Sequence, residues 1–463
     1  MARSRTTMTT KRLLPASGSA RAARSSSRAS EPMTGQPTAG DFLADEARAL
    51  LTRVERLKPF ILQETMLPAA ALLPRTLVAI EDLLLCERAK LHGLGQSYLR
   101  WLAGPGRSAP VTEQQRKFTV IRLRLNEHLA QLDLFADAIT QRSESETGLW
   151  LSGLDVAAHD ALRLNDGVGE MEEVPVICYL DRGPGAAIRR ARTRLPGGVA
   201  NPVAVIRVPR ERMVGHGIAS SLVHEVGHQG AALLDLVPSL RAELQRRSQS
   251  AEDAWHCWAA WISEIIADFW SVAKLGIGST LGLIGVVSLP RPFVFRFTLD
   301  DPHPFPWIRV LVSAAIGDRL YPDPQWTQVA RLWQQMYPPS TAPDRVAEVI
   351  EMLEPTLAQL ADLIATHVPA RLNGPTLQDA LAHESRNPDA LRELFTESTR
   401  QSAARVRPVH RFAMLGQARW DRRLAAGQES RVTDRMLTGL AAKSTMQMAM
   451  STARIPSAIS ERQ

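Results

Sequence analysis

The stretch that organises this sequence reads Ser220-Ser221-Leu222-Val223-His224-Glu225-Val226-Gly227-His228-Gln229. Side chains four residues apart on an α-helix lie about 40° from each other around the helix axis, so His224 and His228 point the same way. Two imidazoles on one face match two corners of a tetrahedral zinc site, and Glu225 can reach a zinc-bound water without being a ligand. The stretch therefore predicts a helix that presents two zinc ligands. The alternative is a pair of structural histidines on a core helix.

A catalytic zinc needs a third protein ligand and one open position. The candidate lies downstream, in the mostly apolar stretch Trp261-Ile262-Ser263-Glu264-Ile265-Ile266-Ala267-Asp268-Phe269-Trp270. Glu264 and Asp268 share a helical face there, and two carboxylates on a buried helix are costly unless they are paired or bind a metal. A ligand role for Glu264 removes that cost, and Asp268 can then accept the free ring N–H of a ligating histidine. The alternative is a structural ion pair with an arginine.

Together, these two segments resemble the gluzincins, the thermolysin-like class of zinc metallopeptidases. In that class the third ligand is a glutamate on a following helix, with an aspartate one turn later. The resemblance implies that His224, His228 and Glu264 bind the metal, that Glu225 is the general base, and that Asp268 supports a ligand. It covers residues 203–310, and the 35 residues between His228 and Glu264 make a longer connection than we expect for thermolysin.

A further histidine is a candidate catalytic residue. His303 lies in the turn Asp301-Pro302-His303-Pro304, ahead of a helix that contains Arg309. A His-Pro turn with a downstream arginine also follows the glutamate helix in some membrane-associated zinc peptidases, which this chain faintly resembles. That resemblance implies that His303 donates to a developing oxyanion, and a structural role in the turn is the alternative. His216 and His256 are rival metal ligands, but capping or packing accounts for them better.

The rest of the chain predicts a mainly α fold with a small β-sheet (α+β), in which helical regions flank a zincin-like catalytic core. Val174–Leu180 and Val203–Val208 are short and β-branched and predict strands, with Ala186–Leu195 as a further pairing segment. We expect Val203–Val208 to bind an extended substrate by strand addition. The expected division is a disordered basic tail (1–40), an N-terminal helical region (41–165), the zincin-like core (170–310), a C-terminal helical region (311–443) and a frayed tail (444–463).

Local signals predict where several elements begin. Asp41 is expected to cap the first helix, and a second helix is expected to follow Pro74. Thr112 and Gln115 have the spacing of a capping box that opens a third helix. The polar segment Ser143–Gly148 predicts a loop, and Pro343 predicts the first turn of a later helix.

The formal charge of +7 does not indicate a nucleic-acid partner. Seven basic residues and one acidic residue lie in residues 1–40, so +6 of this charge is in a tail and not on a folded face. The tail lacks the apolar segment of a secretion signal, and no apolar run approaches the roughly 20 residues of a membrane span. The three cysteines form neither a disulfide framework nor a thiolate metal set. We therefore expect a cytoplasmic protein without nucleic-acid or membrane partners. Organellar targeting by the tail and non-classical secretion are the alternatives.

The expected activity is hydrolysis of peptide bonds by a zinc metallopeptidase that holds one Zn²⁺ per chain and acts on a peptide or protein. Zinc lowers the pKa of its bound water toward about 7 and polarises the scissile carbonyl. Glu225 takes the proton of that water and passes it to the leaving amine. Two other classes stay open. One is a non-catalytic, zinc-stabilised helical scaffold or adaptor, and the other is a nucleic-acid-associated protein that works through the basic tail.

Overall fold

The computed structural model describes residues 38–57, 70–169, 171–182, 185–210, 216–250, 253–398 and 406–452. Within these residues the chain is mainly helical and contains one three-stranded sheet, which confirms the predicted mainly α class with a small β-sheet. Apart from its last three residues, the predicted basic tail lies outside the described residues. None of the described helices is both long enough and apolar enough to cross a membrane.

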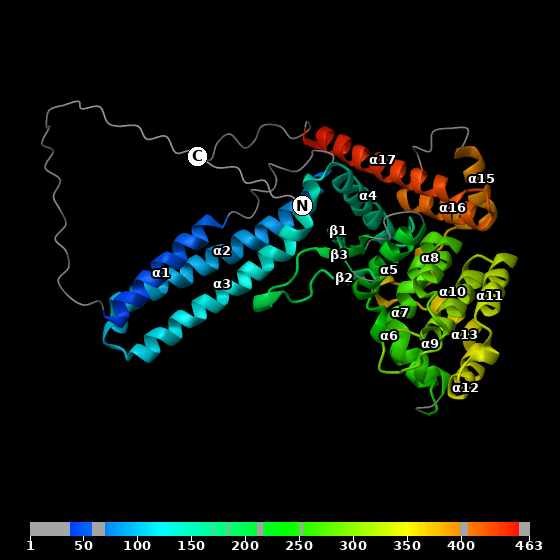
Figure 1. Cartoon of the computed structure of the whole chain (residues 1–463), viewed down its shortest axis with the longest axis horizontal. Helices are drawn as coiled ribbons and strands as arrows, with labels where there is room; N and C mark the ends of the chain where they lie inside the picture. The colour runs from blue at the N-terminus through cyan, green and yellow to red at the C-terminus, as the bar shows by residue number, and fades with distance from the viewer. Residues whose placement is uncertain are drawn as a thin grey trace, which may run out of the picture.

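Three long helices form an arm that projects from the rest of the molecule (Figure 1). At the outer end of the arm, Leu50, Tyr98 and Phe118 belong to a core that the three helices share only with one another. At the inner end, Ile80 and Phe135 pack against the sheet. The three helices are α1 (Ala39–Arg56), α2 (Pro74–Ala103) and α3 (Val111–Thr140).

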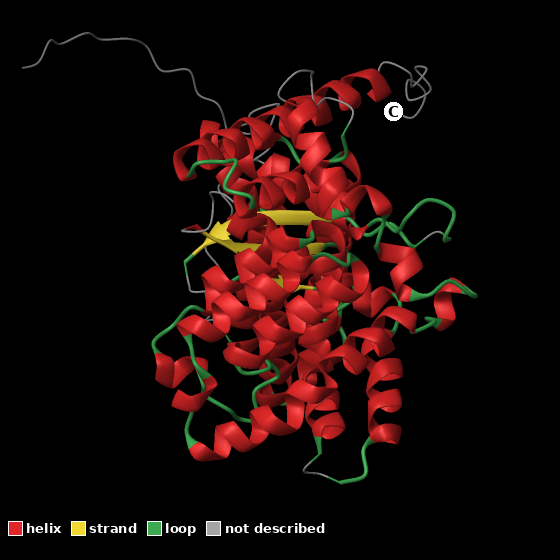
Figure 2. Cartoon of the chain, turned by 90° about the vertical axis from the view of Figure 1, so that its right-hand side faces the viewer, coloured by secondary structure: helices red, strands yellow, loops and turns green. Residues whose placement is uncertain are grey.

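The sheet lies between the inner end of the arm and a helical body (Figure 1), and Figure 2 shows its strands with helices above and below them. Its strand order is β1-β3-β2, with β3 parallel to β1 and antiparallel to β2. Ile177 and Val205 belong to the core shared with the arm, whereas Cys178 and Ile206 belong to the core of the body. Both faces are therefore covered, which explains why the strands are almost entirely apolar. The strands are β1 (Val176–Asp181), β2 (Ala187–Arg189) and β3 (Ala204–Pro209).

Side chains from neighbouring helices close the outer edge of β1. The Asp155 carboxylate accepts the N–H of Cys178 at 2.8 Å, and Arg142 donates to the carbonyl of Cys178 at 2.7 Å. The side-chain amide of Gln141 bonds both backbone groups of Leu180, each at 2.8 Å. A strand whose outward N–H and C=O groups are already paired does not add another strand.

The place of β3 in the sheet contradicts one expectation. This strand, which corresponds to the predicted strand Val203–Val208, is hydrogen bonded to a neighbour on each side. Its backbone therefore cannot accept an extended peptide, and the expected strand addition at Val203–Val208 is wrong. The remaining edge of the sheet is the outer edge of β2, which lies in the segment predicted to pair.

The body is built from helices on the far side of the sheet, which share one continuous apolar core. Helix α4, which the sequence places with the N-terminal helices, packs in this core beside α5 and α17. The helices of the body are α4 (Ser145–Leu162), α5 (His216–Leu233), α6 (Leu236–Arg247), α7 (Ala254–Leu275), α8 (Ile277–Val287), α9 (Arg291–Val294), α10 (Pro306–Leu320), α11 (Pro324–Met336), α12 (Asp344–Leu353), α13 (Leu357–Thr366), α14 (Leu377–Leu381), α15 (Pro388–Ser398), α16 (Pro408–Trp420) and α17 (Ala426–Thr452).

Two predicted helix caps are wrong. The N-cap of α1 is Thr38, whose hydroxyl accepts the N–H of Asp41 at 3.2 Å, while the Asp41 carboxylate accepts the N–H of Thr38 at 3.0 Å. Asp41 therefore completes a capping box and is not itself the cap. Helix α3 begins after Pro110 without a side-chain cap, because Gln115 donates to Thr119 at 3.0 Å and not to the backbone ahead of the helix.

Other predicted ends shift by a few residues. Pro74 is the first residue of α2, as expected. The predicted loop Ser143–Gly148 is wrong from Ser145 onward, since α4 begins there and Gly148 packs against Ala70 of the neighbouring segment. Pro343 is the N-cap of α12 and precedes its first turn. Helix α17 continues to Thr452, so the first nine residues of the predicted frayed tail are helical, and residues 453–463 lie outside the described part.

Candidate metal centre

Helices α5 and α7 lie in direct contact beneath the candidate site, and two glycines make this contact close. A Cβ at Gly227 would lie 2.9 Å from the Cβ of Trp270, and a Cβ at Gly230 would lie 2.3 Å from the Trp270 ring. Real Cβ atoms do not approach other atoms so closely, so any larger residue would push the helices apart. The sequence thus brings the histidines of α5 within reach of the carboxylates of α7.

The structure brings the three predicted metal ligands together. The Nε2 atom of His224 lies 3.3 Å from Oε2 of Glu264, and the Nε2 atom of His228 lies 3.4 Å from Oε1 of the same carboxylate. The ligand atoms of all three residues lie within 4.8 Å of one another. The side chains of His224, His228 and Glu264 are 15, 16 and 9% exposed, so the cluster lies just beneath the surface.

These residues fit a zinc ion in both spacing and chemistry. In a tetrahedral site with bonds of about 2.0–2.1 Å, neighbouring ligand atoms are about 3.3 Å apart, which is close to the separation of both histidine–glutamate pairs. The Oε2 atom of Glu264 is buried, and although Nε2 of His224 and Nε2 of His303 each lie 3.3 Å away, it forms no well-aligned hydrogen bond within the described structure. Such an atom is costly to bury, and coordination to a cation would satisfy it. Two imidazoles and one carboxylate are also a donor set of catalytic zinc sites.

Asp268 and Arg309 hold His224 from the side opposite Glu264. The Oδ1 atom of Asp268 lies 2.9 Å from Nδ1 of His224, which leaves Nε2 of that ring directed at Glu264. Arg309 on α10 donates to both carboxylate oxygens of Asp268, at 2.7 and 2.9 Å. The structure therefore contains the hydrogen bond predicted between Asp268 and a histidine, and also the ion pair with an arginine foreseen as the alternative.

Burial and mutual charge shift the pKa values of the cluster. Burial lowers the pKa of His224, but the carboxylates of Asp268 and Glu264 outweigh burial and raise this pKa to about 9. Burial, together with the charge of His224, lowers the pKa of His228 to about 4. Burial alone would raise the pKa of Glu264, but His224 brings it down to about 2. The cluster therefore favours a protonated His224 that faces an ionised Glu264, while His228 is held neutral.

Glu225 is buried next to the candidate ligands. Burial raises the pKa of its carboxyl group, while the neighbouring His224 opposes this shift. Glu264, Arg309 and His303 are also close enough to act on its charge. A buried carboxyl group with a raised pKa holds a proton more readily than an exposed one, which suits a group that takes up and releases a proton.

His303 reaches the same cluster from the turn ahead of α10. Its Nδ1 atom lies 2.7 Å from Oδ1 of Asp301, and its Nε2 atom lies 3.3 Å from Oε2 of Glu264. The ring is 51% exposed, so it forms the solvent-facing rim of the site. His256, in contrast, lies in the first turn of α7, where its N–H donates to Asp253, and it is not part of the cluster. His216 begins α5, and its side chain lies outside the described part.

Arg309 is the site residue that the sequence did not assign. The sequence marks Arg309 only as an arginine downstream of the His-Pro turn, yet in the structure it contacts Asp268 and lies 3.5 Å from Oε2 of Glu264. The sequence signal for Arg309 is its position between the apolar residues Ile308 and Val310. An arginine that is buried in an apolar helix needs an acidic partner.

Comparisons of the chain with protein-family models, with curated proteins and with solved structures find no match. The resemblance to gluzincins therefore rests on the motif residues and their spacing.

Proposed function

We propose that this chain is a zinc-dependent peptidase whose metal ligands are His224, His228 and Glu264. The observation that carries this proposal is the convergence of two Nε2 atoms on one buried carboxylate at the spacing of a tetrahedral site. Within the described fold, the surrounding segments then correspond to a zincin-like core: a small sheet, the helix α5 that follows it, and the glutamate helix α7. One Zn²⁺ per chain is the proposed cofactor.

The chemistry divides between the metal and the side chains. When bound, zinc supplies Lewis-acid polarisation of the scissile carbonyl and makes water more acidic. Glu225 takes a proton from the attacking water and delivers it to the amine nitrogen as the C–N bond breaks. His303, at the rim, donates from Nε2 to the oxygen of the scissile carbonyl as negative charge develops there. Asp268, paired with Arg309, keeps the His224 ring in the orientation in which Nε2 faces the metal.

We propose that an extended peptide binds along the outer edge of β2, in place of the expected site at β3. The edge of β1 is closed by side chains, and the segment after β2 is held next to the site because Ala191 donates its N–H to Gln229, the residue after His228. Strand addition uses main-chain hydrogen bonds, so N-methylation of the peptide next to the scissile bond should lower kcat/KM about tenfold or more. Equal cleavage of the methylated peptide would refute this binding mode.

Metal analysis combined with a peptidase assay tests the proposed function. We expect about one zinc per chain in the wild type, and far less after His224→Ala or Glu264→Ala. Glu225→Gln should keep its zinc and lose at least about 100-fold in the rate of hydrolysis of a fluorogenic peptide library. A wild-type protein without zinc, or one in which Glu264→Ala binds zinc as tightly as before, would show that the proposed ligand set is wrong.

The limited exposure of the three ligands favours a second candidate, a zinc-stabilised protein without catalysis. In that case Glu225→Gln would change neither zinc content nor any activity, while zinc removal would lower the melting temperature. The effect of Glu225→Gln on peptide hydrolysis therefore distinguishes the two candidates.

A further inference from the structure

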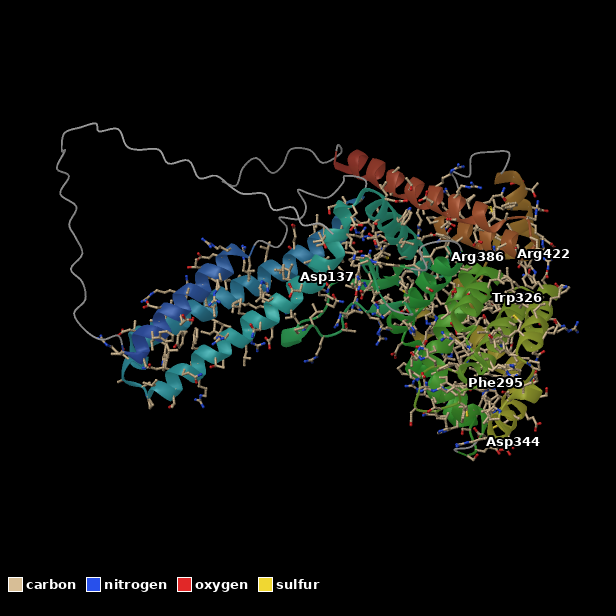
Figure 3. The ribbon with its side chains drawn as sticks, in the orientation of Figure 1. Asp137, Phe295, Trp326, Asp344, Arg386 and Arg422 are labelled. Carbon is tan, nitrogen blue, oxygen red and sulfur yellow. The ribbon has the colours of Figure 1, made fainter. Side chains whose placement is uncertain are left out.

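A groove on the body, which shares no lining residue with the metal centre, lies between α8, α11 and the turn that joins α16 to α17. Its volume is about 910 Å³. Its apolar wall includes Leu281 of α8, Leu332 of α11, Trp420 at the end of α16 and Leu424 of the turn. Figure 3 shows Arg422 of this turn and Trp326 of α11 on the same side of the body, away from the arm.

Some charged side chains of the groove form ion pairs and others do not. Arg419 lies 3.2 Å from the carboxylate of Glu429, and Asp421 lies 3.2 Å from Arg392. Arg331 and Arg422 also line the groove, and within the described ranges neither forms an ion pair. One of these two arginines comes from α11 and the other from the turn, so two cations without acidic partners stand on different walls.

The backbone of Arg422 adopts a conformation that an arginine rarely takes. Its φ angle is +56°, and it follows Asp421, the residue that caps the C-terminus of α16. Glycine is favoured at this position, because a side chain there costs on the order of 1 kcal/mol. The chain therefore presents a cation to the groove at a position where glycine would fold more easily.

Helix α11 continues the apolar wall beyond the groove. It buries Trp326, Val329 and Trp333, as the 3.6-residue period requires. Leu332 and Met336, one turn apart on another face, are 47 and 54% exposed. Two large apolar side chains in line with an apolar groove form a stripe, and such exposed stripes mark interaction sites.

We propose that this groove binds an acidic amphipathic helix of a partner protein. Apolar side chains of the helix, spaced three or four residues apart, would contact Leu332, Met336 and Trp420. Acidic side chains along its flanks would pair with Arg331 and Arg422. A ligand with one carboxylate, such as a fatty acid, would pair with one of these arginines and would leave the other without a partner. The two arginines therefore favour a helix with several carboxylates.

The test uses the full chain and a fluorescein-labelled peptide of about 18 residues, in which leucines at helical spacing alternate with glutamates. Its control is the same peptide with lysine in place of glutamate. Fluorescence polarisation should show saturable binding of the acidic peptide and at least about tenfold weaker binding of the basic one. Binding should be unaffected by EDTA, because the groove does not depend on the metal centre.

Two variants remove the unpaired cations without threatening the fold. Arg422→Gly places the favoured residue at a positive φ, and Arg331→Gln changes an exposed side chain. Each should weaken binding about three- to tenfold. Arg116→Gln, on the arm, is the matched control and should bind as the wild type does. Absence of binding, equal binding of the acidic and basic peptides, unchanged binding by both variants, or displacement of the peptide by dodecanoate would each overturn the proposal.

Discussion

Gly227 of α5 lies so close to Ala267 of α7 that a Cβ on the glycine would come within 2.9 Å of the Ala267 Cα atom. Ala267 is the residue before Asp268, and Gly227 is the residue before His228, so this contact sets the distance between the two halves of the candidate metal centre. The glycine is needed here for its small size, because the contact is made with backbone that cannot rotate away.

Gly227→Ala is expected to separate α5 from α7. The added methyl group meets backbone atoms, and overpacking of this kind costs about 1–3 kcal/mol of unfolding free energy. Thermal unfolding should show a lower melting temperature, and zinc affinity should fall because the ligands on the two helices move apart. Gly93→Ala in α2 is the control, since nothing lies within 4 Å of its Cβ position. A Gly227→Ala protein as stable as Gly93→Ala would contradict the role assigned to this contact.

Asp268→Asn is expected to weaken zinc binding about 10- to 100-fold. The variant keeps the size of the side chain but loses the charge that orients His224 and pairs with Arg309. Competition with a zinc chelator measures the change in Kd. The control is Asp301→Asn. Asp301 contacts His303 but none of the proposed zinc ligands, so the Kd of the Asp301→Asn protein for zinc should match that of the wild type. Equal Kd values for the Asp268→Asn and Asp301→Asn proteins would refute this role of Asp268.

His303→Asn should retain zinc and lower kcat about 10²- to 10³-fold, with little change in KM. The physical reason is that His303 is proposed to stabilise charge that develops only as the substrate reacts. His256→Asn, in the first turn of the same helix as Glu264, is the matched control and should leave kcat unchanged. If His303→Asn instead raises KM alone, His303 binds substrate and does not assist the reaction.

His159 predicts a pH dependence of stability. Burial, assisted by the charge of Arg75, lowers the pKa of this histidine from 6.5 to about 3. The unfolded chain therefore binds one more proton than the folded chain between these values, and stability falls as the pH drops below about 6.5. Between pH 7 and pH 5 the loss due to His159 should be on the order of 1–2 kcal/mol.

Denaturant unfolding of the wild type and His159→Gln at both pH values measures this effect. In the wild type, His159 accepts a hydrogen bond from the N–H of Val176 at 3.3 Å. Glutamine also offers an acceptor for this N–H, but its side chain does not titrate. The difference in unfolding free energy between pH 7 and pH 5 should be smaller in the variant. The same pH dependence in both proteins would show that His159 is not a source of acid lability.

The sequence predicts those features of the site that depend on residues close together in the chain. The four-residue spacing of His224 and His228, and of Glu264 and Asp268, follows from the helical period, and each pair shares a helix as expected. The β-branched composition also predicts β1 and β3 to within two residues, whereas the further pairing segment, Ala186–Leu195, extends six residues beyond the end of β2. What spacing cannot predict is distance between helices, which here depends on Gly227 lying against backbone that is 40 residues away in the chain.

Long-range pairing is the other part that the sequence does not reveal. Helix α4 packs in the larger core because Gly153 lies against the backbone of Leu437, and Trp150 donates its indole N–H to Asp434. Neither pair has a local signal, since the partners are more than 280 residues apart. The central position of β3 is likewise a property of the assembled sheet and not of its own residues.

The outer half of the arm buries its apolar side chains among α1, α2 and α3 only, so it keeps its own stability. Substitutions or insertions at the tip around Gly104 should leave the geometry of the candidate metal centre unaltered, because the described structure links that tip to the sheet through the helices α2 and α3. The arm can thus tolerate changes of sequence that leave the body unaffected, and it can be shortened in the laboratory to obtain a smaller protein for crystallisation.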